Sequence, residues 1–516
     1  MVRAEAPELL PAESDASSPS PQDLLSDKVL KILYLILGAG TLFAYNVFIS
    51  CADYFDAINP TEENVAGEMA TYQLTSMFIV TLILLPFSTS KTRSNDHDVF
   101  VTTGSSRPIV CIMKEFFFRL IDIYSPARRV LYGFIFTFLF LLAYLLLPPS
   151  VITGPILNLF STFVGIADAL SQSGLYILAA NYGKPTLTVA ATLGGAISGF
   201  VAGLMRLATR GVFDTDSVSG LRSGADLLIG LALGYSIVLI GGIIVVEKDL
   251  EKRQLREFED IEIEGHLHSR GLHVNMTQQA KSAKFQELRA IYCSAFLLTW
   301  KPIVSAFLNF FITLALFPGV TLDFLSTVGN FSLGNWLPVV LISTFNGGDC
   351  VGRYILGSES NILYRLLMTR VDRESQIFIE RVGSVELSVG EDVMNEDEQS
   401  MSEGPECVGH RTLKYYSRLV WWPTFARTVF FPLFAMCTTN NPTIAPDSLR
   451  CALVFVFGVS NGFIHCSNFT VAPTLVNTEE QKNAVSMLLL LAIYSGLCLG
   501  AIFGLLVEKV IRDITR

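Results

Sequence analysis

Residues 227–246 read LLIGLALGYSIVLIGGIIVV, a run that holds no charged residue. A helix rises 1.5 Å per residue, so about 20 apolar residues cross the hydrocarbon core of a bilayer, which is roughly 30 Å thick. The whole chain of 516 residues is 51% hydrophobic and only 16% charged, whereas soluble domains carry about 25% charged residues. The run therefore predicts a membrane-spanning helix, and the composition excludes an ordinary soluble protein.

Comparable apolar runs recur along the chain and predict an all-α polytopic membrane protein. We expect eleven transmembrane helices, at about 29–50, 67–87, 130–147, 151–180, 186–206, 225–246, 290–317, 334–356, 413–437, 450–470 and 484–507. The ninth is the least apolar because Lys414, Arg418 and Arg427 interrupt it. The stretch 112–124 is too short and too charged to span, and we expect an interfacial helix there.

Polar segments divide these spans into two groups. Residues 1–28 hold six acidic residues among Pro and Ser, which predicts a disordered cytosolic tail. The polar segment 247–289 is expected to be a cytosolic loop between an N-terminal six-helix bundle, 29–246, and a C-terminal five-helix bundle, 290–516. A second long loop, 358–412, is strongly acidic and is expected to be solvated. Two bundles in a 6+5 arrangement suit a transporter that rocks one half against the other.

Basic residues beside the spans predict the orientation, because cytosolic loops are enriched in Lys and Arg. The loops after the second and sixth spans are rich in Lys and Arg, while the connections after the third and seventh have none. We therefore expect the N-terminus in the cytosol and, with eleven spans, the C-terminus outside. The chain ends in Arg-Asp-Ile-Thr-Arg, which is no retention signal, so we expect the plasma membrane.

Charged side chains inside the spans are the first candidates for function. A charge at the bilayer centre costs about 2.5–3.5 kcal/mol, so such groups normally face the bundle interior and pair. Asp349 and Arg353 lie four residues apart on one helical face. Either the pair neutralises itself and locks two helices, or, together with Asn346, it binds an uncharged polyhydroxylated ligand such as a ribose. The spacing favours the ligand.

Other polar and small residues in the spans support weaker predictions. In the fourth span, Asp168 and Gln172 lie one turn apart, and a glutamine amide can bind the edge of a base. The fifth span repeats glycine every four residues at 195, 199 and 203, which predicts close helix packing. His465 is more simply explained as a satisfied histidine of the bundle than as a proton carrier.

Several of these stretches together resemble a known family. Phe345, Asn346, Asp349, Gly352 and Arg353 match the FNxxDxxGR signature of the equilibrative nucleoside transporters. Residues 38–46 resemble that family's GxGTLxPWN motif, with Ala and Tyr in place of Pro and Trp; 427–434 are similar to RxxFxPLF, and 457–463 with 472–473 to FGxSNGY and AP. Residues 167–169 and 204–225 look more like the plant and protist branches. The resemblance covers roughly residues 29–510.

The resemblance implies a fold related to the major facilitator superfamily, with a central cavity between two halves. It also implies roles for individual side chains. Asp349 and Arg353 would bind the ribose, Gln172 would bind the base, and Asn346 would support the site.

Two further pairs of residues take roles from the resemblance. Leu42 and Tyr45 would line the cavity beneath the base, where the tyrosine keeps an aromatic face and adds a hydroxyl. Asp168 stands where animal members have a small residue, and with His465 it makes proton coupling a candidate property. Base preference stays open, because Tyr45 replaces the usual Trp.

We therefore expect facilitative transport of nucleosides through a lipid bilayer by alternating access. A proton-coupled nucleoside or nucleobase symporter is the alternative, and a receptor with a cytosolic partner at the acidic 358–412 loop is a third. The sequence has no GxxxxGK[ST] loop, which argues against ATP-driven transport. No cysteine pair or catalytic constellation suggests a metal, another cofactor, nucleic-acid binding or enzymatic activity.

Overall fold

In the computed structural model, the described residues are 24–59, 65–88, 125–182, 184–213, 217–264, 278–322, 324, 333–357, 420–438, 445–476 and 478–515. Within these ranges the secondary structure is helical and contains no strand. The expected interfacial helix 112–124, most of the N-terminal tail and all of the acidic loop 358–412 lie outside the described residues.

Most long helices begin and end close to the predicted spans, whereas α8 and α9 extend well beyond theirs, and short helices connect some of them. In chain order the elements are α1 (Asp27–Ser50), α2 (Ala52–Ile58), α3 (Val65–Leu84), η2 (Leu85–Phe87), α5 (Pro126–Leu146), η4 (Pro149–Val151), α6 (Gly154–Asn181), α7 (Pro185–Val212), α8 (Val218–Glu264), α9 (Gln278–Leu316), α10 (Gly319–Leu322), η5 (Gly334–Trp336), α11 (Leu337–Gly357), α14 (Trp422–Ala426), η7 (Arg427–Val429), α15 (Phe430–Cys437), α16 (Asp447–Val471), η8 (Ala472–Leu475) and α17 (Glu479–Thr515). Proline in the first turn starts α5, α6 and α7, where its missing N–H has no helical partner to lose.

The described residues include nine helices that are long and apolar enough to cross a membrane. The eighth predicted span and the described part of the ninth, 420–437, are helical but are not among the nine. In α11, the polar residues Asn346, Asp349 and Arg353 lower the hydropathy. The ninth span is divided into α14, the 3₁₀ turn η7 and α15, each far shorter than a bilayer. The all-α membrane fold is confirmed, whereas the count of eleven stays a prediction.

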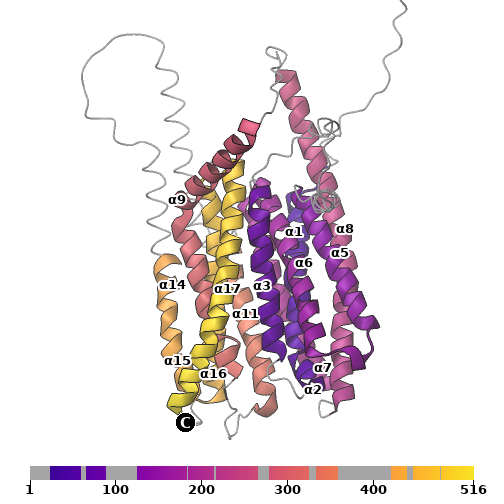
Figure 1. The fold of residues 1–516 in the computed structure, drawn as a ribbon, viewed down its shortest axis with the longest axis vertical. Helices are drawn as coiled ribbons and strands as arrows, with labels where there is room; N and C mark the ends of the chain where they lie inside the picture. Colours follow the sequence, from indigo (N-terminus) through magenta and orange to yellow (C-terminus); the bar gives the residue numbers. More distant parts are fainter. Residues whose placement is uncertain are drawn as a thin grey trace, which may run out of the picture.

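The helices stand side by side in two groups, α1–α8 on one side and α9–α17 on the other (Figure 1). In the first group α1 packs on α7 and α8, and α6 packs on α3 and α5; in the second α9 packs on α17, and α11 on α16. The groups meet where α7 contacts α11 and α16, and where α17 contacts α3 and α6. We call the first group the N-half and the second the C-half.

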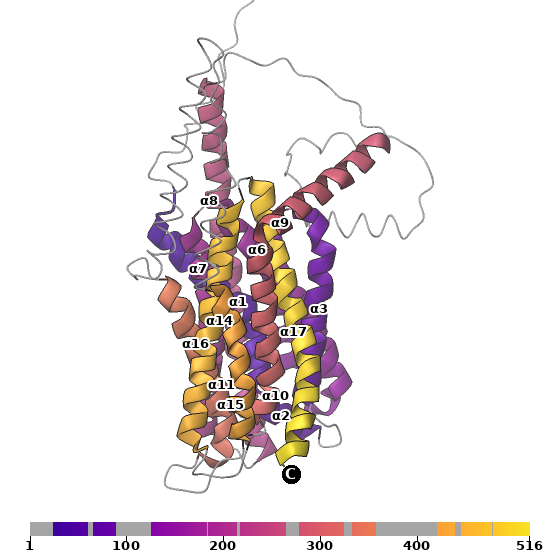
Figure 2. The ribbon, with the colours of Figure 1, turned by 90° about the vertical axis from the view of Figure 1, so that its left-hand side faces the viewer.

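The described parts of the segment 247–289, before and after the gap at 265–277, are helical. Helix α8 continues to Glu264 and α9 begins at Gln278, and both project beyond the bundle at the end opposite the C-terminus (Figures 1 and 2). Lys, Arg, Glu, Gln and Leu dominate 247–256, and these residues have high helix propensity. The hydropathy pattern marked where the apolar span ends but carried no information on where the helix ends.

Candidate functional site

The two C-half helices that build the site approach each other very closely. A Cβ atom at Gly348 or Gly352 of α11 would lie 2.3 or 2.1 Å from a carbonyl oxygen of α16. The same holds in reverse, because a Cβ at Gly462 of α16 would lie 2.1 Å from the Asp349 carbonyl oxygen. Glycines on both helices thus let the backbones touch, and this contact brings the polar side chains of α16 within reach of Asp349.

Asp349 and Arg353 form a buried ion pair on α11. Arg353 Nη2 lies 2.7 Å from Asp349 Oδ2, and both side chains are 7% exposed. The other carboxylate oxygen, Oδ1, accepts a hydrogen bond of 2.8 Å from Asn461 Nδ2 on α16. The amide of Asn461 is itself held in place, since its Oδ1 accepts bonds of 2.9 Å from Asn309 and from Thr313 on α9. Three helices of the C-half therefore fix the carboxylate.

The same network reaches a second buried arginine. Arg427 of η7 donates to Thr313 Oγ1 at 2.8 Å and to the Phe457 carbonyl at 3.1 Å. Its guanidinium also lies 4.3 Å from the centre of the Phe457 ring, a favourable cation–π contact. Arg427 thus supports Thr313 and, through it, the amide that holds Asp349.

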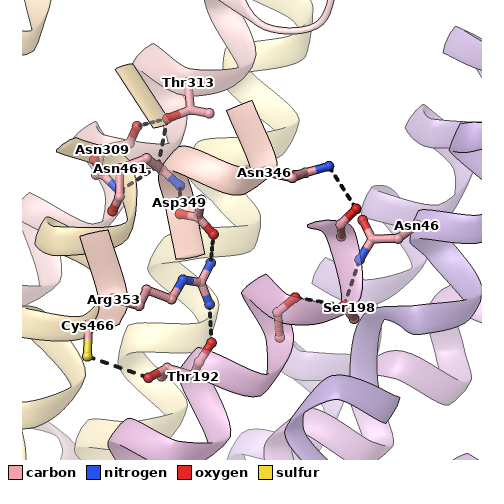
Figure 3. A network of polar contacts seen from close by, with 12 residues as sticks. Asn46, Thr192, Ser198, Asn309, Thr313, Asn346, Asp349, Arg353, Asn461 and Cys466 are labelled. Carbon is pink, nitrogen blue, oxygen red and sulfur yellow. Dashed lines mark hydrogen bonds and ion pairs between the residues drawn. The ribbon is translucent and has the colours of Figure 1, made fainter. Parts of the chain in front are cut away.

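Arg353 also crosses to the N-half. Its Nη1 donates to the backbone carbonyl of Thr192 on α7, and Figure 3 shows the guanidinium between Asp349 and that carbonyl. Thr192 Oγ1 in turn lies 3.6 Å from Cys466 Sγ on α16. The Nε of Arg353 has no hydrogen-bond partner among the described residues. A carboxylate can accept about four hydrogen bonds, so the pair keeps both acceptor and donor capacity for a ligand.

The glycines that repeat every four residues in α7 face α11, and the two helices pack closely there, as predicted. A Cβ at Gly199 would lie 3.0 Å from the Asn346 side chain, and one at Gly203 would lie 2.8 Å from Ser343 Oγ. Asn346 donates to the Gly199 carbonyl at 3.2 Å and makes no bond to Asp349 or Arg353. The structure therefore places Asn346 at the contact between the halves, beside the ion pair.

Gln172 of α6 is buried, with 5% of its surface exposed. Its Oε1 accepts a hydrogen bond of 3.0 Å from the hydroxyl of Tyr494 on α17, while its Nε2 has no partner within the described residues. Asp168, one turn earlier, is 1% exposed and accepts a bond of 2.8 Å from Gln73 on α3. The fourth span thus directs an amide and a carboxylate at neighbouring helices.

Leu42 and Tyr45 of α1 are half-buried. A Cβ at Gly195 would lie 3.5 Å from Arg353 Nη1 and 3.7 Å from Leu42 Cδ1, so Leu42 borders the ion pair. Tyr45 lies within electrostatic reach of Asp168.

His465 packs edge-on against Phe310 at 5.1 Å and also contacts Phe469. Its Nδ1 has no hydrogen-bond partner among the described residues. No contact joins His465 directly to Asp168 in the described part of the chain: Asp168 bonds to Gln73, and the imidazole is held by rings.

Sequence reasoning assigned no role to three groups that the structure brings to the site. Asn461 was visible inside a motif, but nothing local indicated that it bonds to Asp349. Tyr494 gave no signal at all, since a tyrosine in an apolar helix is ordinary. The Thr192 carbonyl is a backbone group, and no residue pattern predicts it.

Comparison with known proteins bears on the resemblance. The family model described as "Nucleoside transporter" matches residues 413–509. The Arabidopsis thaliana protein named "Equilibrative nucleotide transporter 7" is 23% identical over 505 residues, covering 93% of this chain and 97% of that relative. The similarity to this equilibrative nucleotide transporter extends over nearly the whole length of the chain.

Other relatives match shorter parts. "Equilibrative nucleotide transporter 2" of Arabidopsis thaliana is 30% identical over 203 residues, covering 38% of this chain and 47% of the relative. "Equilibrative nucleoside transporter 4" of Danio rerio is 25% identical over 211 residues, covering 39% and 28%. The resemblance predicted from the span motifs is confirmed, and the relatives are transporters rather than enzymes.

Solved structures of the major facilitator superfamily align along the chain. The E. coli fucose:proton symporter FucP covers 95% of this chain and 99% of its own, with 10% identity and a TM-score of 0.43. A bacterial homologue of the lysosomal transporter Spinster covers 92% and 82%, with 14% identity and a TM-score of 0.42.

Proposed function

We propose that this chain is a facilitative transporter that carries nucleosides across a membrane by alternating access. The observation that carries the proposal is the buried Asp349–Arg353 pair at the contact between the halves. Its carboxylate retains acceptor capacity and its Arg353 Nε retains a donor, which suits the vicinal hydroxyls of a ribose because each hydroxyl both donates and accepts. The residues around the pair resemble the FNxxDxxGR signature of the equilibrative nucleoside transporters.

We propose that the other residues implied by the resemblance contact the rest of the nucleoside. Gln172 offers an amide for the base, while Leu42 and Tyr45 offer an apolar edge and an aromatic face from α1. Asn346 holds the α7–α11 contact beside the pair. We propose that the six-helix N-half and the five-helix C-half move against each other around this site.

Uptake in transporter-deficient cells tests the assignment. Tritiated uridine and adenosine should enter cells that express the chain, and Asp349→Asn or Arg353→Leu should reduce uptake to background at unchanged surface expression. Arg222 and Asp226 form another pair at i,i+4 spacing, but they are about 40% exposed. Asp226→Asn is therefore the matched control and should transport normally. Full uptake by both site variants would refute the assignment.

Proton coupling is the second candidate, and Asp168 favours it. This carboxylate is 1% exposed and bonds to a neutral amide rather than to a cation. An unpaired carboxylate inside a membrane protein is costly and commonly marks a proton relay. If coupling operates, uptake rises at acidic external pH, a protonophore abolishes the rise, and Asp168→Asn flattens the profile. If uptake by the wild-type protein does not depend on external pH, proton coupling is rejected and facilitative transport remains.

We propose the plasma membrane as the location, with the N-terminus in the cytosol and the C-terminus outside. The basic residues after the second and sixth predicted spans support this orientation. The projecting ends of α8 and α9 lie opposite the C-terminus (Figure 2), which agrees with an odd number of spans. Epitope tags at each terminus, probed in intact and permeabilised cells, test it.

A further inference from the structure

The hydrogen bond between Tyr494 and Gln172 joins the two halves next to the ligand-binding groups. Tyr494 belongs to α17 of the C-half and is 2% exposed, and Gln172 belongs to α6 of the N-half and is 5% exposed. The phenol oxygen lies 3.0 Å from Gln172 Oε1. A hydrogen bond between two such buried side chains is strong because the local dielectric is low, so it fixes the position of the amide.

The direction of this bond decides what the amide offers to a ligand. A tyrosine hydroxyl has one hydrogen to donate, and within the described part of the chain its only acceptor is Gln172 Oε1. If the amide turned over, its nitrogen would donate to Tyr494 and the phenol hydrogen would be buried without an acceptor, which is costly. Tyr494 therefore keeps the amide oxygen occupied and leaves the Nε2 hydrogens unpaired.

The free amide belongs to the same polar region as the ion pair. Tyr494 lies within electrostatic reach of Tyr176 and of Asp168, and these residues flank Gln172 by one turn on either side in α6. Tyr176 in turn lies within electrostatic reach of Arg353 and Asp349. Under the proposed function, a ligand whose sugar meets the ion pair turns its base towards Gln172.

We infer that Tyr494 is a positioning residue that sets the polarity of the base contact: it holds Gln172 as a hydrogen-bond donor, so that the site selects bases that present an acceptor there. This inference rests on the proposed function. Because the bond crosses between α6 and α17, the donor is fixed only while the two halves are in contact at this level.

Adenosine analogues test the inference, because the acceptors of the adenine ring are nitrogens that can be removed one at a time. We would measure how adenosine and its 1-deaza, 3-deaza and 7-deaza analogues compete with tritiated uridine for uptake. The wild-type protein should bind at least one analogue about fivefold more weakly than adenosine, the effect of one neutral hydrogen bond. In Tyr494→Phe that ratio should fall towards one, because the freed amide can turn.

Tyr34→Phe is the matched control. Tyr34 is 0% exposed and lies in the same hydrophobic cluster as Tyr494, but its hydroxyl bonds to no described residue. It should keep the wild-type ratio, whereas a purely structural role for Tyr494 would weaken competition by all four compounds alike.

Each outcome decides between the proposals. An unchanged ratio in Tyr494→Phe overturns the inference and leaves the proposed function intact, as does a wild-type protein that binds all analogues as well as adenosine. If Tyr494→Phe fails to reach the membrane, Gln172→Met, which lacks the donor, must abolish the discrimination, and a ratio that persists there overturns the inference. Absence of any wild-type nucleoside uptake refutes the proposed function itself.

Discussion

Asn461 donates a hydrogen bond of 2.8 Å to Asp349, from a helix whose backbone touches that of α11 through glycine. The carboxylate is thus held from two sides, by Arg353 in its own helix and by Asn461 in the next. Because Asn309 and Thr313 hold the Asn461 amide, the carboxylate is oriented before a ligand arrives.

Asn461→Leu should weaken nucleoside binding by tenfold or more. A hydrogen bond to a buried charged group contributes about 1.5–3 kcal/mol, and the variant removes the donor while roughly keeping the volume. The apparent affinity for uridine, measured by uptake at equal surface expression, checks this. Asn158→Ala is the control, because Asn158 bonds to Glu68 at an exposed position; an effect of equal size there would contradict the prediction.

Gly352→Ala should destabilise the protein and abolish transport. The added Cβ atom of the alanine would lie 2.1 Å from the Val459 carbonyl oxygen. Helices α11 and α16 would therefore have to separate, at a cost of about 1–3 kcal/mol. The melting temperature of the purified protein and its uridine uptake should both fall. A Cβ at Gly234 would have no neighbour within 4 Å, so Gly234→Ala should leave the melting temperature and the uptake unchanged.

Asp53→Asn should lower the melting temperature without changing substrate selectivity. Arg206 of α7 is 1% exposed, and Asp53 of α2 is its carboxylate partner. Removing one partner of a buried pair costs about 3 kcal/mol or more; we expect the lower end because the Asp53 side chain is 28% exposed. Equal melting temperatures for this variant and for the exposed-pair variant Asp226→Asn would disprove the prediction.

The sequence predicted what local pattern determines. Hydropathy located the apolar parts of the long helices, and i,i+4 spacing paired Asp349 with Arg353, because both signals lie within a few turns of one helix. The contacts that orient the site join residues 112 positions apart in the case of Asp349 and Asn461, and 322 apart for Gln172 and Tyr494. These contacts depend on how the helices pack against each other, which the spacing of residues along the sequence does not predict.

The extent of the helices was also beyond the sequence signals. The same Asn346, Asp349 and Arg353 that identify the site make α11 a poor membrane span by hydropathy. The described part of the ninth span is helical but is broken by a 3₁₀ turn at Arg427, whose guanidinium donates to Thr313 and to the Phe457 carbonyl. In α11 and in the ninth span, the polar residues needed at the site lower the hydropathy by which a membrane span is recognised.

Counterflow in proteoliposomes tests the central claim most directly. Purified protein would be reconstituted into vesicles loaded with unlabelled uridine, with no ion gradient and no ATP, and external tritiated uridine would be followed over time. We predict transient accumulation of label with the wild-type protein and none above empty vesicles with Asp349→Asn. The account is contradicted if the wild-type protein exchanges no label, or if the Asp349→Asn variant exchanges it as fast.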